Sequence, residues 1–223
     1  MVFAAGFGTR MGELTKDTPK PMLKVASKPL IDYALDHVFA AGINRVVVNT
    51  HYLPDPINEH LETRPGVTLL HEKNEILETG GGLRNALPLL GPGPVVTMNP
   101  DAIFLGRNPV IRLREADLEA DALLLLVRRE NALMHKGLGD FDLAPDGGVQ
   151  RPSGDTAEYV YTGAQIIDPK RLDEIPEVSF SLNVLWNKML SEGRVKGVIY
   201  PGRWVDVGTP EGLERASAEV LWP

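Results

Sequence analysis

Two glycines, an arginine and a lysine flanked by prolines follow the first apolar run of the sequence, at residues 4–22. Gly6 and Gly8 let a backbone turn tightly and approach an anion with its peptide N–H groups. Arg10 can bind two phosphate oxygens at once, whereas Lys20 offers a point charge that its two prolines hold in place. These residue types in this order predict a loop that binds phosphate groups.

Neither of the two standard phosphate-loop templates fits this stretch. The dinucleotide fingerprint needs a third glycine at the position of Met11, and the P-loop needs Gly-Lys-Ser/Thr where the chain has Met11, Gly12 and Glu13. What remains is a G-x-G-T-R motif followed by P-K-P. Each part alone is common in ordinary turns, but the order and spacing together favour a triphosphate site.

Short apolar runs rich in Val and Leu predict the strands that must position these groups. The runs are mostly continuous, as in strands covered on both faces, and residues 29–42 follow a helical period that ends at Gly42. This alternation predicts an α/β fold with a Rossmann-like open, mostly parallel (mixed) sheet and helices on both faces. The runs are residues 1–5, 45–50, 67–70, 94–99, 122–127 and 159–167. The first is short for a central strand, so we expect the natural chain to begin a few residues earlier.

The pattern changes after about residue 128. Residues 141–151, with Pro-Asp-Gly-Gly at their centre, predict a hairpin that forms a small β insertion. Residues 181–193 place five apolar side chains on one helical face, and Thr209 before Pro210 predicts the start of a last helix.

The net charge of −7 and the absence of cysteine exclude several classes of protein. Nucleic-acid binding depends on clustered Lys and Arg, and a disulfide or thiolate site needs cysteine. No apolar segment approaches the roughly 20 residues that span a bilayer, and the start lacks the features of a secretory signal. The five histidines have no spacing typical of zinc sites. We expect a cytoplasmic protein that binds neither nucleic acid nor membrane, as a monomer or small homo-oligomer.

Four stretches together resemble the signature of the sugar-1-phosphate nucleotidylyltransferases, also called NDP-sugar pyrophosphorylases. They are AAGFGTRMGELTKDTPKPMLKVASKPLI at 4–31, LETGGGLRNALPLLG at 77–91, TMNPDAIF at 97–104 and GRWVDVGTPEGL at 202–213. The short length and GDF at 139–141 are most similar to family members that use UTP and N-acetylmuramate 1-phosphate in peptidoglycan recycling. The resemblance implies the nucleotide-diphospho-sugar transferase fold over 1–223, with a nucleotide-binding half at 1–128 and a sugar-binding half with the second metal ligand at 129–223.

The reaction implied by this resemblance explains the charged residues near the start of the chain. The phosphate of a sugar 1-phosphate attacks the α-phosphorus of a nucleoside triphosphate, and pyrophosphate leaves. Such an enzyme must align two anions and offset the charge that develops between them. We expect Arg10 to act on the β- and γ-phosphates and Lys20 on the α-phosphate.

The resemblance also implies a divalent cation, Mg²⁺ with Mn²⁺ as a substitute, bound by Asp101 and Asp206. Asp101 stands just beyond the strand at residues 94–99, at the edge where open α/β sheets bind ligands. Asp206 follows an apolar pair and precedes Gly208, which permits a tight backbone. Two carboxylates supplemented by phosphate oxygens and water suit Mg²⁺.

The nucleoside is expected against the loop after the first strand and the glycine triplet at 80–82. Three glycines weaken a helix by roughly 1 kcal/mol each, so we interpret them as room for a flat base or ribose. Pro100 departs from the family pattern, in which a small residue is common, and this change affects contacts near Asn99. The expected nucleotide-binding residues are Ala4, Ala5, Gly6, Gly8, Thr9, Arg10, Lys20, Glu78, Thr79, Gly80, Gly81 and Asn99.

The sugar side departs from the family pattern as well. Several longer relatives hold the sugar phosphate with the lysine of a Glu-Lys-Pro motif, and the corresponding region of this chain has no lysine. Lys24 or the metal must then take that role. The candidate sugar contacts lie at strand ends or loops of the expected ligand edge, namely Asp140, Glu158, Thr162, Gly163 and Asn183.

Two other functions remain open at this point. The same phosphate chemistry would serve GTP with mannose 1-phosphate, or another sugar- or choline-phosphate nucleotidylyltransferase. A catalytically silent nucleotide-binding regulatory module could also have this fold, because fold alone does not determine function. The presence of Arg10, Lys20, Asp101 and Asp206 together favours an enzyme.

Overall fold

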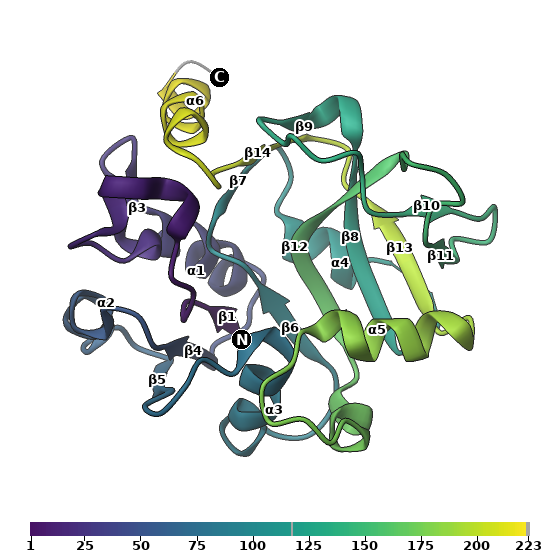
Figure 1. Ribbon diagram of the computed structural model, residues 1–223, viewed down its shortest axis with the longest axis horizontal. Coiled ribbons are helices and arrows are strands. Elements are labelled where there is room, and N and C mark those ends of the chain that lie inside the picture. Colours follow the sequence, from purple (N-terminus) through teal and green to yellow (C-terminus); the bar gives the residue numbers. More distant parts are fainter. Residues whose placement is uncertain (117, 222–223) are drawn as a thin grey trace.

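Seven strands form one central sheet in the computed structural model, which describes residues 1–116 and 118–221 (Figure 1). The strand order is β13-β8-β12-β6-β1-β4-β5. Strand β12 is antiparallel to both of its neighbours, and the other six strands run in one direction. The strands are β1 (Val2–Phe3), β4 (Val46–Thr50), β5 (Val67–His71), β6 (Val95–Met98), β8 (Ala122–Arg128), β12 (Tyr159–Ile167) and β13 (Val195–Ile199). The predicted mixed, mostly parallel sheet is thus confirmed.

Continuous apolar runs become strands here because helices cover the sheet on both faces. All five residues of β4 and the first six of β8 are buried. Such strands have no solvent face, and therefore no alternation of polar and apolar residues. Each of the six runs predicted as strands overlaps one, with β5 and β8 each extending one residue beyond its run.

The helices divide into two groups, one on each face of the sheet. In Figure 1, α3 and α5 lie in front of the sheet, with α1 and α4 behind it. One core cluster joins α1, α2 and α4 to the sheet, and a second joins α3 and α5 to its other face. The helices are α1 (Leu30–Ala40), α2 (Pro54–Leu61), α3 (Glu78–Leu90), α4 (Pro109–Arg114), α5 (Leu182–Ser191) and α6 (Pro210–Leu221).

A smaller three-stranded sheet has the order β7-β14-β9, from β7 (Ala102–Leu105), β14 (Arg203–Asp206) and β9 (Ala132–Leu133). Strand β14 is antiparallel to β7, so that Asp206 lies opposite Ala102. The predicted hairpin is also present, as β10 (Asp142–Leu143) and β11 (Val149–Gln150), with β2 (Lys24–Val25) and β3 (Lys28–Pro29) forming another. The β7–β14 pair brings distant parts of the sequence to the edge of the main sheet.

Side-chain caps begin the two helices predicted in the second half of the chain. The hydroxyl of Ser181 accepts a hydrogen bond from the N–H of Asn183 at the start of α5. The hydroxyl of Thr209 accepts from the N–H of Gly212 at 3.2 Å, as expected for the start of α6. Both caps satisfy N–H groups that have no partner inside the helix.

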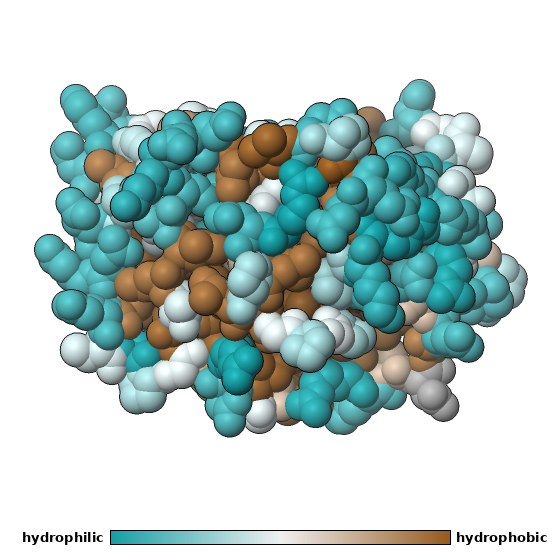
Figure 2. Space-filling view, turned by 90° about the horizontal axis from the view of Figure 1, so that it is seen from below, coloured by the Kyte–Doolittle hydropathy of each residue, from teal (hydrophilic) through white to brown (hydrophobic). Residues whose placement is uncertain are grey.

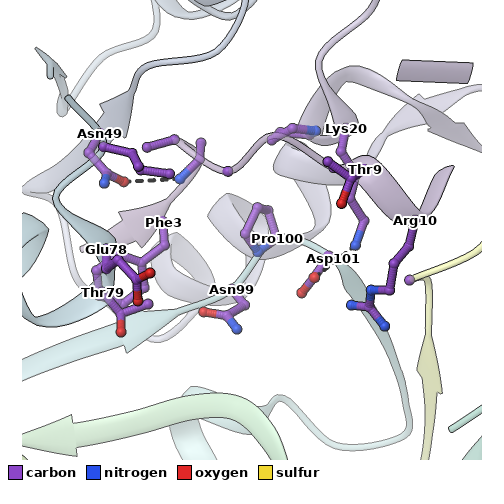
Figure 3. Close-up of a pocket in the computed structure, with 17 residues that line it drawn as sticks. Phe3, Thr9, Arg10, Lys20, Asn49, Glu78, Thr79, Asn99, Pro100 and Asp101 are labelled. Carbon is purple, nitrogen blue, oxygen red and sulfur yellow. Dashed lines mark hydrogen bonds and ion pairs between the residues drawn. The ribbon is translucent and has the colours of Figure 1, made fainter. Parts of the chain in front are cut away.

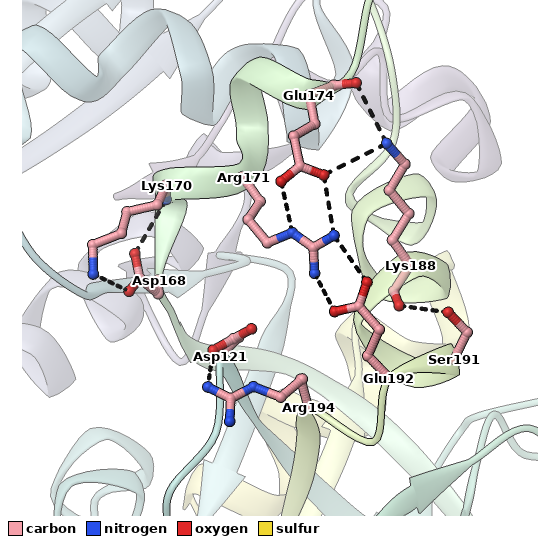
Figure 4. Close-up of polar contacts among 9 residues, drawn as sticks. All are labelled: Asp121, Asp168, Lys170, Arg171, Glu174, Lys188, Ser191, Glu192 and Arg194. Atoms are coloured by element: carbon pink, nitrogen blue, oxygen red, sulfur yellow. Dashed lines mark hydrogen bonds and ion pairs between the residues drawn. The ribbon is translucent and has the colours of Figure 1, made fainter.

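A cluster of charged side chains joins the short 3-10 helix Pro169–Glu174 to the end of α5 (Figure 4). The guanidinium of Arg171 donates to Glu174 at 2.8 and 3.0 Å and to Glu192 at 2.5 and 3.0 Å. These two carboxylates raise the pKa of Arg171. Arg194 donates to Asp121 at 2.6 Å in the same region. Exposed ion pairs contribute little free energy of unfolding, so α5 is held mainly by its buried apolar face.

Figure 2 shows the molecule from below the view of Figure 1, with hydrophobic residues in the middle of this face and hydrophilic residues at its two sides. Large apolar side chains that are well exposed include Val178, at 63%, and Leu138, at 58%. No helix within residues 1–116 and 118–221 combines the length and apolar character that crossing a membrane requires.

Candidate active site

A cavity of about 350 Å³ opens where β1, β4 and β6 end, at the carboxyl edge of the parallel strands (Figure 3). Ligands of open α/β sheets commonly bind at this edge. Ten of the twelve predicted nucleotide-binding residues line the cavity, and so does Asp101. The full lining is Phe3, Ala4, Ala5, Gly6, Gly8, Thr9, Arg10, Lys20, Pro21, Asn49, Ile76, Glu78, Thr79, Asn99, Pro100, Asp101 and Gly208.

The loop after β1 has the backbone that its glycines were expected to allow. Gly8 has a φ of 66°, and a Cβ there would lie 3.0 Å from Cβ of Lys20, so close packing favours glycine as well. Gly6 differs, because a Cβ added to it would meet no atom of residues 1–116 and 118–221 within 4 Å. The fold itself therefore has no need of glycine at position 6, whereas a ligand backed against the loop would.

Lys20 and Asp101 form an ion pair at one end of the cavity. Nζ of Lys20 donates to Oδ2 of Asp101 at 2.8 Å, and the lysine side chain is only 11% exposed. Burial raises the pKa of Asp101, but the charge and hydrogen bond of Lys20 and the charge of Arg10 lower it more. The net result is a pKa below the ordinary value, so that Asp101 is ionised at neutral pH.

Because the pKa of Asp101 is lowered in the folded protein, the difference in free energy of unfolding between the wild type and Asp101→Asn should depend on pH. A group whose pKa is lowered by folding stabilises the fold above its unfolded pKa of about 4, and this stabilisation is lost as the pH falls through the folded pKa. The free energy of unfolding of the wild type should therefore exceed that of Asp101→Asn by a constant amount above about pH 5, with the two values converging at lower pH. Urea unfolding of both proteins between pH 3 and 7 measures this difference, and a gap that widens with acid would contradict the assignment.

Asp206, at the end of β14, does not line the cavity but lies directly behind Gly208, which does. The N–H of Val207 donates to the backbone oxygen of Asp101 at 3.0 Å, which holds the two strand ends together. At Gly208, an added Cβ would lie 2.8 Å from both Nη1 of Arg10 and Oδ1 of Asp206. Arg10, Asp206 and the Lys20–Asp101 pair thus meet at the charged end of the cavity, which we define as these four residues.

The two carboxylates of the charged end fit a hard divalent cation. Asp206 ends β14 and Asp101 directly precedes β7, its antiparallel neighbour, and carboxylate oxygens are ligands that Mg²⁺ prefers. Within residues 1–116 and 118–221, no group of three or more His, Asp or Glu side chains could hold a metal by itself. A cation bound by Asp101 and Asp206 would therefore need phosphate oxygens and water to complete its coordination.

Replacing Gly208 with alanine should lower kcat/KM about 10- to 100-fold, because the new methyl group displaces the guanidinium of Arg10. Arg10 is flexible at that end and Gly208 does not have a left-handed φ, so the free energy of unfolding should change by less than about 1 kcal/mol. Gly154→Ala is a matched control, because a Cβ there meets no atom within 4 Å in the part of the chain that the structure describes. Steady-state kinetics and urea unfolding of both variants check this, and equal kcat/KM values would contradict it.

The opposite end of the cavity has fewer charges. Figure 3 shows Phe3, Asn49, Glu78 and Thr79 there, away from Lys20 and Arg10. The N–H of Ala4 donates to Oδ1 of Asn49 at 3.0 Å and is therefore unavailable to a ligand. We call this part of the cavity the base end, after the nucleobase that the sequence resemblance leads us to expect there.

The structure corrects the interpretation of the glycine triplet. Gly80 and Gly81 do not line the cavity, and both of their N–H groups donate to the backbone oxygen of Phe180, at 2.8 and 3.1 Å. A Cβ on Gly80 would lie 2.3 Å from the Phe180 ring, and one on Gly81 would lie 2.4 Å from the oxygen of Val178. The first two glycines thus leave room for the chain segment before α5, and not for a base or ribose.

The structure does not bring the five predicted sugar contacts together at the cavity as it does the nucleotide-binding residues, and none of the five lines it. Thr162 does not suit a sugar contact through its side chain, because it is 1% exposed and its hydroxyl donates to the backbone oxygen of Leu125 at 2.8 Å. Gly163, with a φ of 83°, packs against Asn99, which does line the cavity.

The other three sugar candidates are held by side-chain or backbone partners. Asp140 accepts from the N–H of Tyr161, Glu158 pairs with Arg128, and Asn183 accepts from Arg151 at 2.7 Å. Lys24 lies exposed in β2 and is also absent from the cavity lining.

The residues that were not identified from the sequence include Asn49, which lines the cavity, and His135, which lies beside Asp206. Asn49 ends an apolar run at the ligand edge of the sheet, which is the same signal that identified Asp101. His135 lies with Nδ1 at 3.7 Å from Oδ2 of Asp206, and its buried Nε2 has no hydrogen-bond partner among the described residues. No local pattern distinguishes this histidine from the others.

Comparisons with known proteins agree with this geometry. A model of the family described as nucleotidyl transferase matches residues 1–222. The chain is 38% identical to the N-acetylmuramate alpha-1-phosphate uridylyltransferase of Caulobacter vibrioides, over 99% of this chain and 96% of that protein. It is 34% identical to the protein of the same name from Neisseria meningitidis serogroup B, over 98% and 96%.

Solved structures share the fold at lower identity. HddC from Yersinia pseudotuberculosis superimposes with a TM-score of 0.80 at 23% identity, over 98% of this chain and 97% of that one. The sequence resemblance, the fold and the family match all agree. The chain belongs to the nucleotidyl transferase family.

Proposed function

We propose that this protein transfers a uridylyl group from UTP to an amino-sugar 1-phosphate, N-acetylmuramate 1-phosphate, forming a UDP-sugar and pyrophosphate. The observation that carries the proposal is the charged end of the cavity, where two cations and two carboxylates meet beside an anion-binding loop. The choice of UTP and of the sugar is supported by the two relatives of that name, each matched over nearly its whole length.

The chemistry follows from these side chains. An oxygen of the sugar phosphate forms a bond to the α-phosphorus of UTP, and the bond from that phosphorus to the bridging oxygen breaks. The electron pair of the broken bond leaves with pyrophosphate. Lys20 offsets charge on the α-phosphate and Arg10 on the leaving phosphates, so that two anions can approach in line.

Mg²⁺, or Mn²⁺ in its place, belongs to the same proposal, with Asp101 and Asp206 as its protein ligands. When bound, such an ion neutralises phosphate charge as a Lewis acid. The Lys20–Asp101 pair keeps the carboxylate ionised, which favours its use as a ligand. Asp140, Glu158, Gly163 and Asn183 remain proposed sugar contacts.

The remaining parts of the proposal concern organisation. We propose one domain over residues 1–223, in which residues 1–128 supply the nucleotide site and residues 129–223 supply sugar contacts and Asp206. The main sheet supports this, because it takes strands from both parts. We place the reaction in the cytoplasm, where nucleoside triphosphates are available, with the protein acting as a monomer or small homo-oligomer.

A substrate panel tests the proposal directly. Pyrophosphate release is measured with each of four nucleoside triphosphates against N-acetylmuramate, N-acetylglucosamine, glucose and mannose 1-phosphates, with Mg²⁺ present. We expect the highest kcat/KM for UTP with N-acetylmuramate 1-phosphate. Turnover of GTP with mannose 1-phosphate, without turnover of UTP, would show that the proposed substrates are wrong and that GTP and mannose 1-phosphate take their place. Binding of nucleotide with no turnover of any pair would instead identify a silent binding module.

A further inference from the structure

We infer that Glu72, acting through Asn49, is a positioning residue that holds the two walls of the base end at a fixed separation. This inference rests on the proposed function, because it concerns the nucleotide that the cavity takes. Glu72 does not itself line the cavity.

A chain of hydrogen bonds crosses from one wall of the base end to the other. On one side the N–H of Ala4 donates to Oδ1 of Asn49 at 3.0 Å. Nδ2 of Asn49 then donates to Oε1 of Glu72 at 2.7 Å, and the N–H of Leu77 donates to Oε2 at 2.9 Å. The loop after β1 and the segment before α3 are thereby connected through two side chains.

Both connecting side chains are buried, Asn49 at 2% and Glu72 at 3% exposure. The two donors to Glu72 are neutral amides, and a buried carboxylate in such surroundings is costly. A carboxylate is, however, the group that offers an acceptor to each of two donors at once. The chemistry of Glu72 thus matches a connecting role better than a packing role.

The third glycine of the triplet makes room for this connection. A Cβ on Gly82 would lie 2.9 Å from Oε1 of Glu72 and 3.0 Å from Nδ2 of Asn49. Gly82 therefore makes room for the side chains of Asn49 and Glu72, whereas Gly80 and Gly81 make room for residues 178–180.

Leu77 is held from both sides at the point where the wall begins. Its N–H donates to Glu72, and its backbone oxygen accepts from the N–H of Phe180 at 3.2 Å. The next residue, Glu78, has a φ of 58°, which is unfavourable for a residue with a side chain. Glu78 and Thr79 then line the cavity. Loss of the Glu72 contact should let this strained segment relax and change the separation that a base meets.

An exchange of the two side-chain types tests the inference. In Glu72→Gln one of the two donors loses its acceptor, and in Asn49→Asp two carboxylates face each other where a hydrogen bond was. In the double variant Asn49→Asp/Glu72→Gln every bond can re-form, because the new amide at position 72 donates to the new carboxylate at position 49 and still accepts from the N–H of Leu77. Glu75→Gln, an exposed change of the same kind in the same segment, is the matched control.

We expect each single variant to raise the KM for UTP about tenfold and to narrow the preference for UTP over CTP. The kcat and the KM for the sugar phosphate should change less than about threefold, because the charged end is untouched. The double variant should return to within about threefold of the wild type in the KM for UTP. If Glu72 had only a structural role, the variants would lower the melting temperature. They would not raise the KM for UTP selectively, and the double variant would not restore it.

Two results would overturn the inference. One is a KM for UTP within twofold of wild type in both single variants, and the other is a double variant no better than the worse single one. If Asn49→Asp alone does not fold, the KM for UTP of Glu72→Gln can still be compared with that of the double variant, and this comparison tests the inference. Circular dichroism and urea unfolding establish which variants are folded.

The proposed function can fail separately from this inference. If the wild type prefers another nucleotide, that nucleotide replaces UTP in the same comparison, and only the substrate assignment is lost. If the wild type turns over no pair, the Kd for UTP from calorimetric titration replaces KM, and the rescue by the double variant is judged on that constant.

Discussion

Lys20→Met should lower kcat by about 10²- to 10³-fold, as expected when a preorganised charge near the reacting phosphorus is removed. Methionine keeps most of the volume and apolar contacts of the lysine stem, which is almost buried. What is lost is the ammonium group that we place on the α-phosphate. The KM for nucleotide should rise less than kcat falls, since Arg10 and the loop after β1 still hold the triphosphate.

Lys16→Met is the control for this variant, because Lys16 lies in the same region with a side chain that is 68% exposed. Pyrophosphate release under single-turnover conditions gives the chemical step, and thermal unfolding shows that both variants are folded. A fall in kcat of less than tenfold for Lys20→Met would remove Lys20 from the proposed mechanism.

Asp206→Asn should lower kcat/KM by roughly 10²- to 10³-fold and raise the Mg²⁺ concentration for half-maximal activity, since one of two protein carboxylates is lost. Asparagine has the same shape, so the β7–β14 pairing should remain. Asp101→Asn should give a loss of similar size.

Direct metal binding separates this prediction from a general loss of activity. Mn²⁺ titration followed by electron paramagnetic resonance, with nucleotide present, should show weaker binding in both variants. Asp146→Asn is the control, because this exposed aspartate pairs with Lys196 far along the sheet from the cavity. Unchanged Mn²⁺ affinity in Asp206→Asn would exclude the two-carboxylate site.

The strands and main helices could be predicted because their signals are local. The run at 122–127 is buried on both faces in β8, and Thr209 caps α6 as its position suggested. The loop after β1 was predictable for the same reason, since Gly8 combines a left-handed φ with close packing against Lys20. In each of these cases neighbouring residues decide the structure.

The errors concern contacts between distant parts of the chain. The glycine triplet indicated that something approaches closely, but its spacing could not show that the partner is residues 178–180. Thr162 lies on a strand near the ligand edge, yet its side chain points to Leu125 in the neighbouring strand. The side to which a residue faces changes at the register shift between Tyr161 and Gln165, and Gly163 within it indicates an irregular strand without showing which way the neighbouring side chains turn.

The pairing of β14 with β7 has a consequence for how the protein acquires activity during its synthesis. Asp206 is added roughly a hundred residues after Asp101, which at the usual speed of a ribosome takes several seconds. By the start of that interval the chain already contains every residue that lines the cavity except Gly208. Competence for turnover should therefore arise late and abruptly, when β14 joins β7.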